Sequence, residues 1–125
     1  MLNKSECTGL FVSVDGPNGV GKSTLIGAIQ QHLTRKRYRV YVTKEVSDST
    51  IGKFIRHQHK NCFGKTLAFL LAADRQNHIE LDILPAPQKY DVVITDRYVD
   101  SSLVFQRLDG VALSFVWKLT EESFI

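Results

Sequence analysis

Cysteine and long apolar segments are scarce in this sequence of 125 residues. Its two cysteines, Cys7 and Cys62, stand far apart with no CxxC pair or histidine cluster beside them, which argues against a disulfide framework and a zinc site. No stretch approaches the roughly 18 apolar residues of a membrane span, and the first residues, MLNKSECTG, contain no apolar signal segment. We therefore expect a reduced, cytoplasmic protein that does not cross a membrane.

A strong charge of either sign is also missing, because the formal net charge is only +3 at pH 7. Part of it comes from RKRYR at residues 35–39. We interpret this run as the solvated end of a helix running into a strand, the alternative being a patch for nucleic acid or another anion. The content of 43% hydrophobic and 23% charged residues is that of an ordinary globular protein. The length suits one domain over residues 1–125, with no nucleic-acid partner.

Three short segments are rich in β-branched and aromatic residues: LFVSV at 10–14, RVYVT at 39–43 and DVVIT at 91–95. The first and third are apolar nearly throughout, which is typical of strands buried on both faces of a parallel sheet. Apolar residues at helical spacing lie between and after these segments: residues 25–33, residues 51–55, residues 65 to about 84, and residues 98–108. The alternation of strands and helices predicts a doubly wound α/β fold, in which ligands sit beyond the carboxyl ends of the strands.

The segment GPNGVGKS at residues 16–23 follows the first predicted strand and fits the pattern G-x-x-x-x-G-K-[ST]. Glycines let the backbone surround an anion with N–H groups, and the following helix adds its positive end. Lys22 would reach the outer phosphates, and Ser23 would bind Mg²⁺. A glycine-rich turn that happens to contain a lysine is the alternative, but the position between strand and helix favours a nucleotide phosphate. The residues expected around it are Gly16, Asn18, Gly19, Gly21, Lys22, Ser23 and Thr24.

An acidic residue, Asp96, closes the third predicted strand, where it would organise the metal and the phosphate charge. Taken alone, it could equally be a helix cap or turn residue. The D-x-x-G and N-K-x-D motifs of small GTPases do not appear, and two arginines, Arg75 and Arg97, are present instead. Guanidinium groups bind phosphate through two parallel hydrogen bonds. This set indicates a phosphoryl-transfer enzyme whose acceptor carries a phosphate of its own.

Four segments resemble the thymidylate (dTMP) kinase family in order and spacing, over roughly residues 10–108: FVSVDGPNGVGKST, TKEVSDSTIGKFIR, LLAADRQNHIELDILPA and DRYVDSSLVFQ. The D-R-Y…S…Q block and the A-x-R-x-x-H motif are the specific part, since many families share the P-loop. The resemblance implies a P-loop NTPase-type, three-layer parallel sheet. It also implies transfer of the γ-phosphoryl group of ATP to dTMP, giving dTDP, with Mg²⁺ held near Ser23 and Asp96.

The resemblance also assigns roles to single residues. Lys22, Asp96 and Arg97 would bring the two anions together, with Arg97 on the acceptor phosphate. Tyr98 would pack against the sugar, where its bulk favours deoxyribose, and Arg75 would bind the exocyclic oxygen of thymine. The remaining expected acceptor contacts are Asn18 at the sugar hydroxyl, Gln106 at the base edge, and Ser101, which is alternatively only an N-cap.

Several positions depart from the family pattern. Lys44 replaces an arginine expected at the acceptor phosphate, and residues 46–48 (Val-Ser-Asp) replace Pro-Gly-Gly. Leu71 replaces the phenylalanine that stacks on thymine, which leaves apolar contact without an aromatic face. Gly19 stands where some members carry a P-loop arginine. For Arg75 the alternative is a surface ion pair with Asp74 or Glu80.

The family continues beyond the last residue, Ile125, into further strands and a lid. We therefore expect about three strands, with the later strands and the lid missing and the strand at 10–14 at an exposed sheet edge. Such an edge favours association with another chain, and a homodimer is one form of it. Two other functions stay open: a nucleotide-binding module without catalysis, and a kinase for another nucleoside monophosphate.

Overall fold

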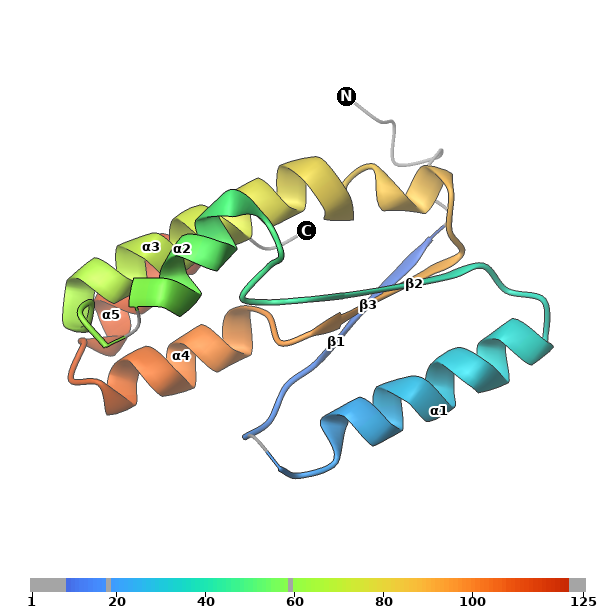
Figure 1. Cartoon of the computed structure of the whole chain (residues 1–125), viewed down its shortest axis with the longest axis horizontal. Coiled ribbons are helices and arrows are strands. Elements are labelled where there is room, and N and C mark those ends of the chain that lie inside the picture. The colour runs from blue at the N-terminus through green and yellow to red at the C-terminus, as the bar shows by residue number, and fades with distance from the viewer. Residues whose placement is uncertain (1–8, 18, 59, 122–125) are drawn as a thin grey trace.

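The computed structural model describes residues 9–17, 19–58 and 60–121, so Asn18 lies outside the described residues. Strands alternate with helices along the chain (Figure 1). The elements are β1 (Leu10–Val14), α1 (Lys22–Arg35), β2 (Val40–Lys44), α2 (Thr50–Gln58), α3 (Gly64–His78), the π-helical turn η1 (Ile79–Ile83), the 3₁₀ turn η2 (Ala86–Gln88), β3 (Val92–Asp96), α4 (Val99–Leu108) and α5 (Leu113–Thr120).

The three strands form one parallel sheet in the order β1-β3-β2. Its register sets Val14 and Lys44 beside Asp96, so the carboxyl ends of all three strands meet at one edge. The predicted α/β fold is confirmed, although β2 and β3 each begin and end one residue later than the sequence suggested. Within the described residues β1 pairs on one side only, as expected, and Leu10 on it is 60% exposed.

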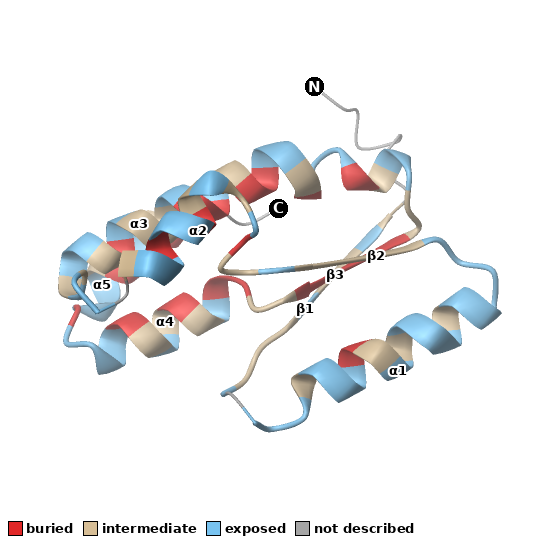
Figure 2. Cartoon of the chain, viewed as in Figure 1, coloured by how far each residue is buried: buried red, intermediate tan, exposed pale blue. Residues whose placement is uncertain are grey.

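Helices cover the sheet on both faces, with α1 on one side and α2 to α5 on the other (Figure 1). Ile26 of α1 packs on Val92 and Ile94 of β3. A second cluster on the opposite face comprises the buried residues Ile79, Ile83, Tyr98 and Val99, with Phe11 and Leu103 packed against them. The central strand β3 is buried over its first four residues (Figure 2), which explains why its sequence is apolar rather than alternating.

The helix predicted over residues 65–84 divides into α3 and the turn η1, which ends just before Pro85. The Leu84 N–H bonds to the Ile79 carbonyl oxygen at 2.9 Å, five residues back, so the last turn is wider than an α-helical turn. The helix predicted at 98–108 is α4, and α5 is an additional helix that the sequence did not indicate. None of the helices in the described part of the chain is long and apolar enough to span a membrane.

Candidate active site

The predicted phosphate loop joins the end of β1 to the start of α1. Gly19 and Gly21 have φ values of +81° and +93°, which residues with a side chain adopt only at a cost. No described side chain caps α1, and its first turn holds no acidic residue, so the positive helix end faces the loop. A cavity of about 430 Å³ opens there, lined by Gly19, Gly21, Lys22, Ser23, Thr24, Lys44, Glu45, Asp96 and Arg97. We call it the phosphate cavity.

Lys22 and Asp96 meet in this cavity. The Lys22 Nζ lies 2.9 Å from Asp96 Oδ1, and the two side chains are 11% and 26% exposed. Ser23 lines the same cavity and offers a hydroxyl oxygen near that carboxylate. No group of three His, Cys, Asp or Glu residues that could hold a metal ion occurs in the described ranges. One hydroxyl and one carboxylate suit Mg²⁺, which takes its other ligands from phosphates and water, and the cavity therefore fits a magnesium-bound polyphosphate.

The start of α4 is tied to the end of β1 through Asp15. Asp15 Oδ1 accepts hydrogen bonds from the Tyr98 N–H at 3.0 Å and from the Ser101 hydroxyl at 2.7 Å. The N-cap position of α4 is Tyr98, and no described side chain caps the helix. Ser101 is therefore not an N-cap in this structure; it fixes the helix to the strand that precedes the phosphate loop.

Arg97 directly follows β3 and has a left-handed backbone, with φ of +74°. Such a conformation costs on the order of 1 kcal/mol in a non-glycine residue, and it persists where neighbours hold it. The Arg97 N–H donates to the Val14 carbonyl, and the Arg97 carbonyl accepts from the Thr95 hydroxyl, each at 2.9 Å. The guanidinium carbon lies 4.9 Å from the centre of the Phe105 ring. Held by these contacts, Arg97 lines both the phosphate cavity and a second, neighbouring cavity.

The second of these cavities, about 520 Å³, lies between the loop after β2 and the helices α3 and α4. We call it the acceptor pocket. Every predicted acceptor residue in the described part of the chain lines it, namely Lys44, Leu71, Arg75, Arg97, Tyr98, Ser101 and Gln106. The sequence did not assign the other lining residues to this site, namely Glu45, Val46, Arg56, Asp74, Ser102 and Phe105.

Arg75 is buried at the floor of this pocket rather than on the surface. Its Nε donates to Glu45 Oε1 at 2.8 Å, and these two side chains are 5% and 8% exposed. One terminal nitrogen, Nη2, donates to the Tyr98 carbonyl at 3.1 Å and to the Ser102 hydroxyl at 2.8 Å. The alternative of a surface ion pair with Asp74 or Glu80 is wrong, because Glu45, thirty residues away in sequence, is the partner.

Asp74 instead anchors the loop of residues 46–49. Its Oδ2 accepts the Ser47 N–H at 2.8 Å, and its Oδ1 accepts the Ser47 hydroxyl at 2.6 Å. Arg56 of α2 donates to the carbonyl oxygens of Val46 and Ser47, both at 2.6 Å. An added Cβ at Gly52 would collide with the Ser47 carbonyl, so α2 can approach this loop only with glycine there. The serines of the loop suggest that it is held by hydrogen bonds, but nothing in the sequence identifies Asp74 as their partner.

Two further groups shape the acceptor pocket chemically. Gln106 is 5% exposed, and its Oε1 is buried without a hydrogen-bond partner among the described residues, so the pocket presents an unused acceptor. Burial, with a smaller effect of the Glu45 charge, raises the pKa of Tyr98 to about 12, against an opposing effect of Arg75. Tyr98 therefore stays a neutral hydroxyl at physiological pH.

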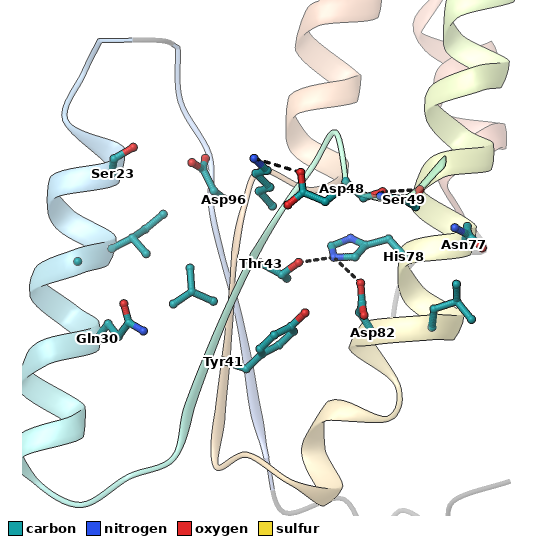
Figure 3. A pocket seen from close by; sticks show the side chains of 16 residues that line it. Ser23, Gln30, Tyr41, Thr43, Asp48, Ser49, Asn77, His78, Asp82 and Asp96 are labelled. Carbon is teal, nitrogen blue, oxygen red and sulfur yellow. Dashed lines mark hydrogen bonds and ion pairs between the residues drawn. The ribbon is translucent and has the colours of Figure 1, made fainter. Parts of the chain in front are cut away.

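A third cavity, about 750 Å³, lies between α1 and the α3–η1 segment beside β2 (Figure 3). Ser23 and Asp96 mark its end at the phosphate cavity, and Tyr41, Thr43, His78 and Asp82 lie deeper along it. We call it the outer cleft. His78 lines this cleft but not the acceptor pocket, whereas Lys44 lines both.

Comparison with known proteins identifies the family of these motifs. A sequence model of the family described as thymidylate kinase matches residues 14–125. A probable thymidylate kinase of Caldivirga maquilingensis is 41% identical over 111 residues, covering 86% of this chain and 54% of that protein. The thymidylate kinase of Geobacillus thermodenitrificans is 38% identical over 119 residues, covering 90% of this chain and 53% of that protein.

The fold has a close counterpart among solved structures. The crystal structure of thymidylate kinase from Ehrlichia chaffeensis superposes with a TM-score of 0.82 at 22% identity, covering 94% of this chain and 69% of the other. The chain spans about half the length of the curated relatives it matches.

Proposed function

The chain belongs to the thymidylate kinase family, and we propose that it provides the phosphate loop and the acceptor pocket for phosphorylation of dTMP by ATP, giving dTDP. The observation that carries this proposal is the position of Arg97. It lines both the phosphate cavity and the acceptor pocket, and it follows directly on Asp96, the partner of Lys22. Two neighbouring cavities that share Arg97 and Lys44 would suit transfer between two phosphates.

The proposed mechanism relies on position and charge rather than on a covalent intermediate. ATP supplies the phosphoryl group when bound with Mg²⁺. Ser23 and Asp96 would hold the metal, and Lys22 would turn from Asp96 to the outer phosphates. Arg97 would bind the acceptor phosphate, with its guanidinium kept in place by the Phe105 ring. The positive charge of the Arg97 guanidinium would offset the repulsion between the two anions.

The acceptor pocket would select a deoxynucleotide with a pyrimidine base. Arg75 offers donors to an exocyclic oxygen, and the unpartnered Gln106 oxygen suits a ring N–H. Leu71 supplies an apolar wall in place of an aromatic ring. Tyr98 is only 6% exposed and packs with the core, so its ring is held in place. It would therefore give the sugar a rigid surface to pack against.

Calorimetric titration of dTMP and of Mg²⁺·ATP into the purified chain tests this assignment. We expect saturable binding of both ligands, loss of dTMP binding in Arg97→Met, and loss of ATP binding in Lys22→Ala. Arg107→Met is the matched control, because Arg107 is an exposed residue of α4 that lines none of the three cavities. Absence of dTMP binding to the unaltered chain would overturn the proposal.

A different acceptor base is the second candidate, favoured by Leu71 and by Lys44 on the pocket wall. Lys44 is 54% exposed and pairs with Asp48 at 3.5 Å, so it is available as a single point charge rather than a guanidinium fork. Titration with the other nucleoside monophosphates distinguishes the two. Tighter binding of any of them than of dTMP favours the second candidate.

We also propose a cytoplasmic protein that is able to form a homodimer, with dTMP and ATP as its small-molecule partners and no nucleic-acid partner. The free thiol of Cys62 suits a reducing compartment. The unpaired edge of β1 within the described residues suits contact with a second chain. Light scattering across a concentration series tests the dimer. A mass of 14.1 kDa at every concentration would contradict it.

A further inference from the structure

We propose that His78 is a positioning residue for Arg75, acting through the Glu45 carboxylate. The proposal rests on the proposed function only for its ligand-binding consequence. The geometry itself concerns three side chains of the free protein that are all less than a tenth exposed: those of Arg75, Glu45 and His78.

The three side chains form a continuous chain of contacts. Glu45, directly after β2, accepts Arg75 Nε at Oε1 (2.8 Å) and contacts His78 Nδ1 at Oε2 (3.2 Å). Arg75 and His78 lie three residues apart on α3, so they share a helix face. His78 Nε2 lies 2.7 Å from the Thr43 hydroxyl on β2 and 4.0 Å from Asp82 Oδ2 of η1 (Figure 3).

The direction of the hydrogen bond between His78 and Glu45 is fixed by the carboxylate. Because a carboxylate only accepts hydrogen bonds, Nδ1 of His78 carries the proton and donates it to Oε2 of Glu45. At the other side of the ring, Nε2 is held by the Thr43 hydroxyl at 2.7 Å. The His78 side chain is completely buried, so these contacts hold its ring in one orientation. One rigid ring therefore connects the edge strand β2 with the second oxygen of Glu45.

The contact between His78 and Glu45 determines how Arg75 can pair with the same carboxylate. Arginine and a carboxylate often pair through two parallel hydrogen bonds, which here would draw Nη2 onto Oε2. Instead, His78 occupies Oε2, and Nη2 bonds to the Tyr98 carbonyl and the Ser102 hydroxyl of the α4 segment. His78 thus keeps the guanidinium turned toward α4 at the floor of the acceptor pocket. His78 does not itself line that pocket.

Two substitutions separate positioning from simple packing. In His78→Asn, the side-chain amide nitrogen lies near the position of Nδ1 and can still donate a hydrogen bond to Glu45. In His78→Gln, the longer side chain places its amide near the position of Nε2, which leaves Oε2 of Glu45 without a donor. We expect the Nε–H resonance of Arg75 in ¹⁵N–¹H NMR spectra of the free chain to stay near its wild-type position in His78→Asn. It should move in His78→Gln, as Arg75 shifts to the two-bond pair.

A second readout uses base discrimination. In the proposed complex, Arg75 donates a hydrogen bond to the exocyclic oxygen of thymine, where cytosine carries an amino group instead. The dissociation constant of dCMP divided by that of dTMP therefore measures how well this donor is placed. We expect His78→Gln to lower this ratio about fivefold, the value of one ordinary hydrogen bond, and His78→Asn to preserve it. A purely structural role would lower Tm in both variants and leave the ratio unchanged.

Each outcome decides something. An unmoved Arg75 resonance in His78→Gln overturns the inference. A moved resonance in a chain that does not bind dTMP supports the inference while the proposed function fails. If both variants fail to fold, the ¹⁵N shifts of the wild-type His78 ring still decide, because the proposal requires a proton on Nδ1. A ring without a proton on Nδ1 overturns it.

Discussion

The loop of residues 46–49 is predicted to depend on one buried carboxylate, that of Asp74. Asp74 is 1% exposed and accepts the Ser47 N–H and the Ser47 hydroxyl, with the Ser49 hydroxyl 3.2 Å from Oδ1. Asp74→Ala removes all of these contacts and leaves the Ser47 N–H without a partner. Asp74→Asn keeps one oxygen for that N–H and offers its amide to hydroxyl groups, which can turn to accept it.

The size of each effect follows from these contacts. A hydrogen bond to a charged group contributes about 1.5–3 kcal/mol, and an unpaired buried N–H costs about 1–3 kcal/mol. We therefore expect Asp74→Ala to lower the free energy of unfolding by about 4 kcal/mol. Asp74→Asn loses mainly the charge assistance, about 1–2 kcal/mol. At about 4 °C per kcal/mol for a chain of this size, Tm falls by about 15 °C and about 5 °C.

Urea and thermal unfolding followed by circular dichroism measure both changes. The urea midpoint should fall without a change in the m-value, since the surface exposed on unfolding stays the same. Glu80→Ala is the control on the adjoining turn η1, because Glu80 is exposed and accepts a hydrogen bond from Gln76, one turn back along the helix. Its Tm should stay within about 2 °C of wild type. A Tm for Asp74→Ala within about 3 °C of wild type would refute the reasoning.

Three further predictions concern the cavities. Gln106→Leu removes a buried oxygen that has no partner in the described part of the chain, so we expect an equal or higher Tm together with weaker dTMP binding; a lower Tm with unchanged binding contradicts this. The pKa of Tyr98, about 12 when folded, lies above its unfolded value of about 10, so its contribution to stability is complete below pH 10 and declines as the pH rises toward 12. Urea unfolding at pH 9 and pH 11 should show a smaller decline in Tyr98→Phe than in wild type, and equal declines would exclude this contribution. Lys22→Ala should abolish the rise in Tm that Mg²⁺·ATP produces, whereas the exposed Lys118→Ala should keep it; a rise that persists without Lys22 would argue against the phosphate cavity as the ATP site.

The parts of the site that follow local sequence rules could be predicted. Glycine spacing places the left-handed turns of the phosphate loop, and the apolar strands predict a parallel sheet. Once the strands are parallel, residues that follow them must converge at one edge. Lys22 and Asp96 were expected together on that ground, and they lie 2.9 Å apart.

The parts that depend on burial could not be predicted. Arg75 has acidic residues nearby in sequence, and nothing in the pattern shows that the distant Glu45 is its partner. That pairing follows from the tertiary packing of α3 beside the end of β2, which places both side chains out of water, where each requires a partner. Similarly, α5 has only eight residues, little more than two turns, so its apolar positions form too short a pattern to identify a helix.

The most direct test of the central claim is ³¹P NMR of the purified chain with ATP, Mg²⁺ and dTMP. The account predicts growth of the two phosphorus signals of dTDP together with those of ADP, absent in Arg97→Met and present in Arg107→Met. Saturable binding of both nucleotides without any dTDP signal would contradict phosphoryl transfer by this chain and would leave a nucleotide-binding module.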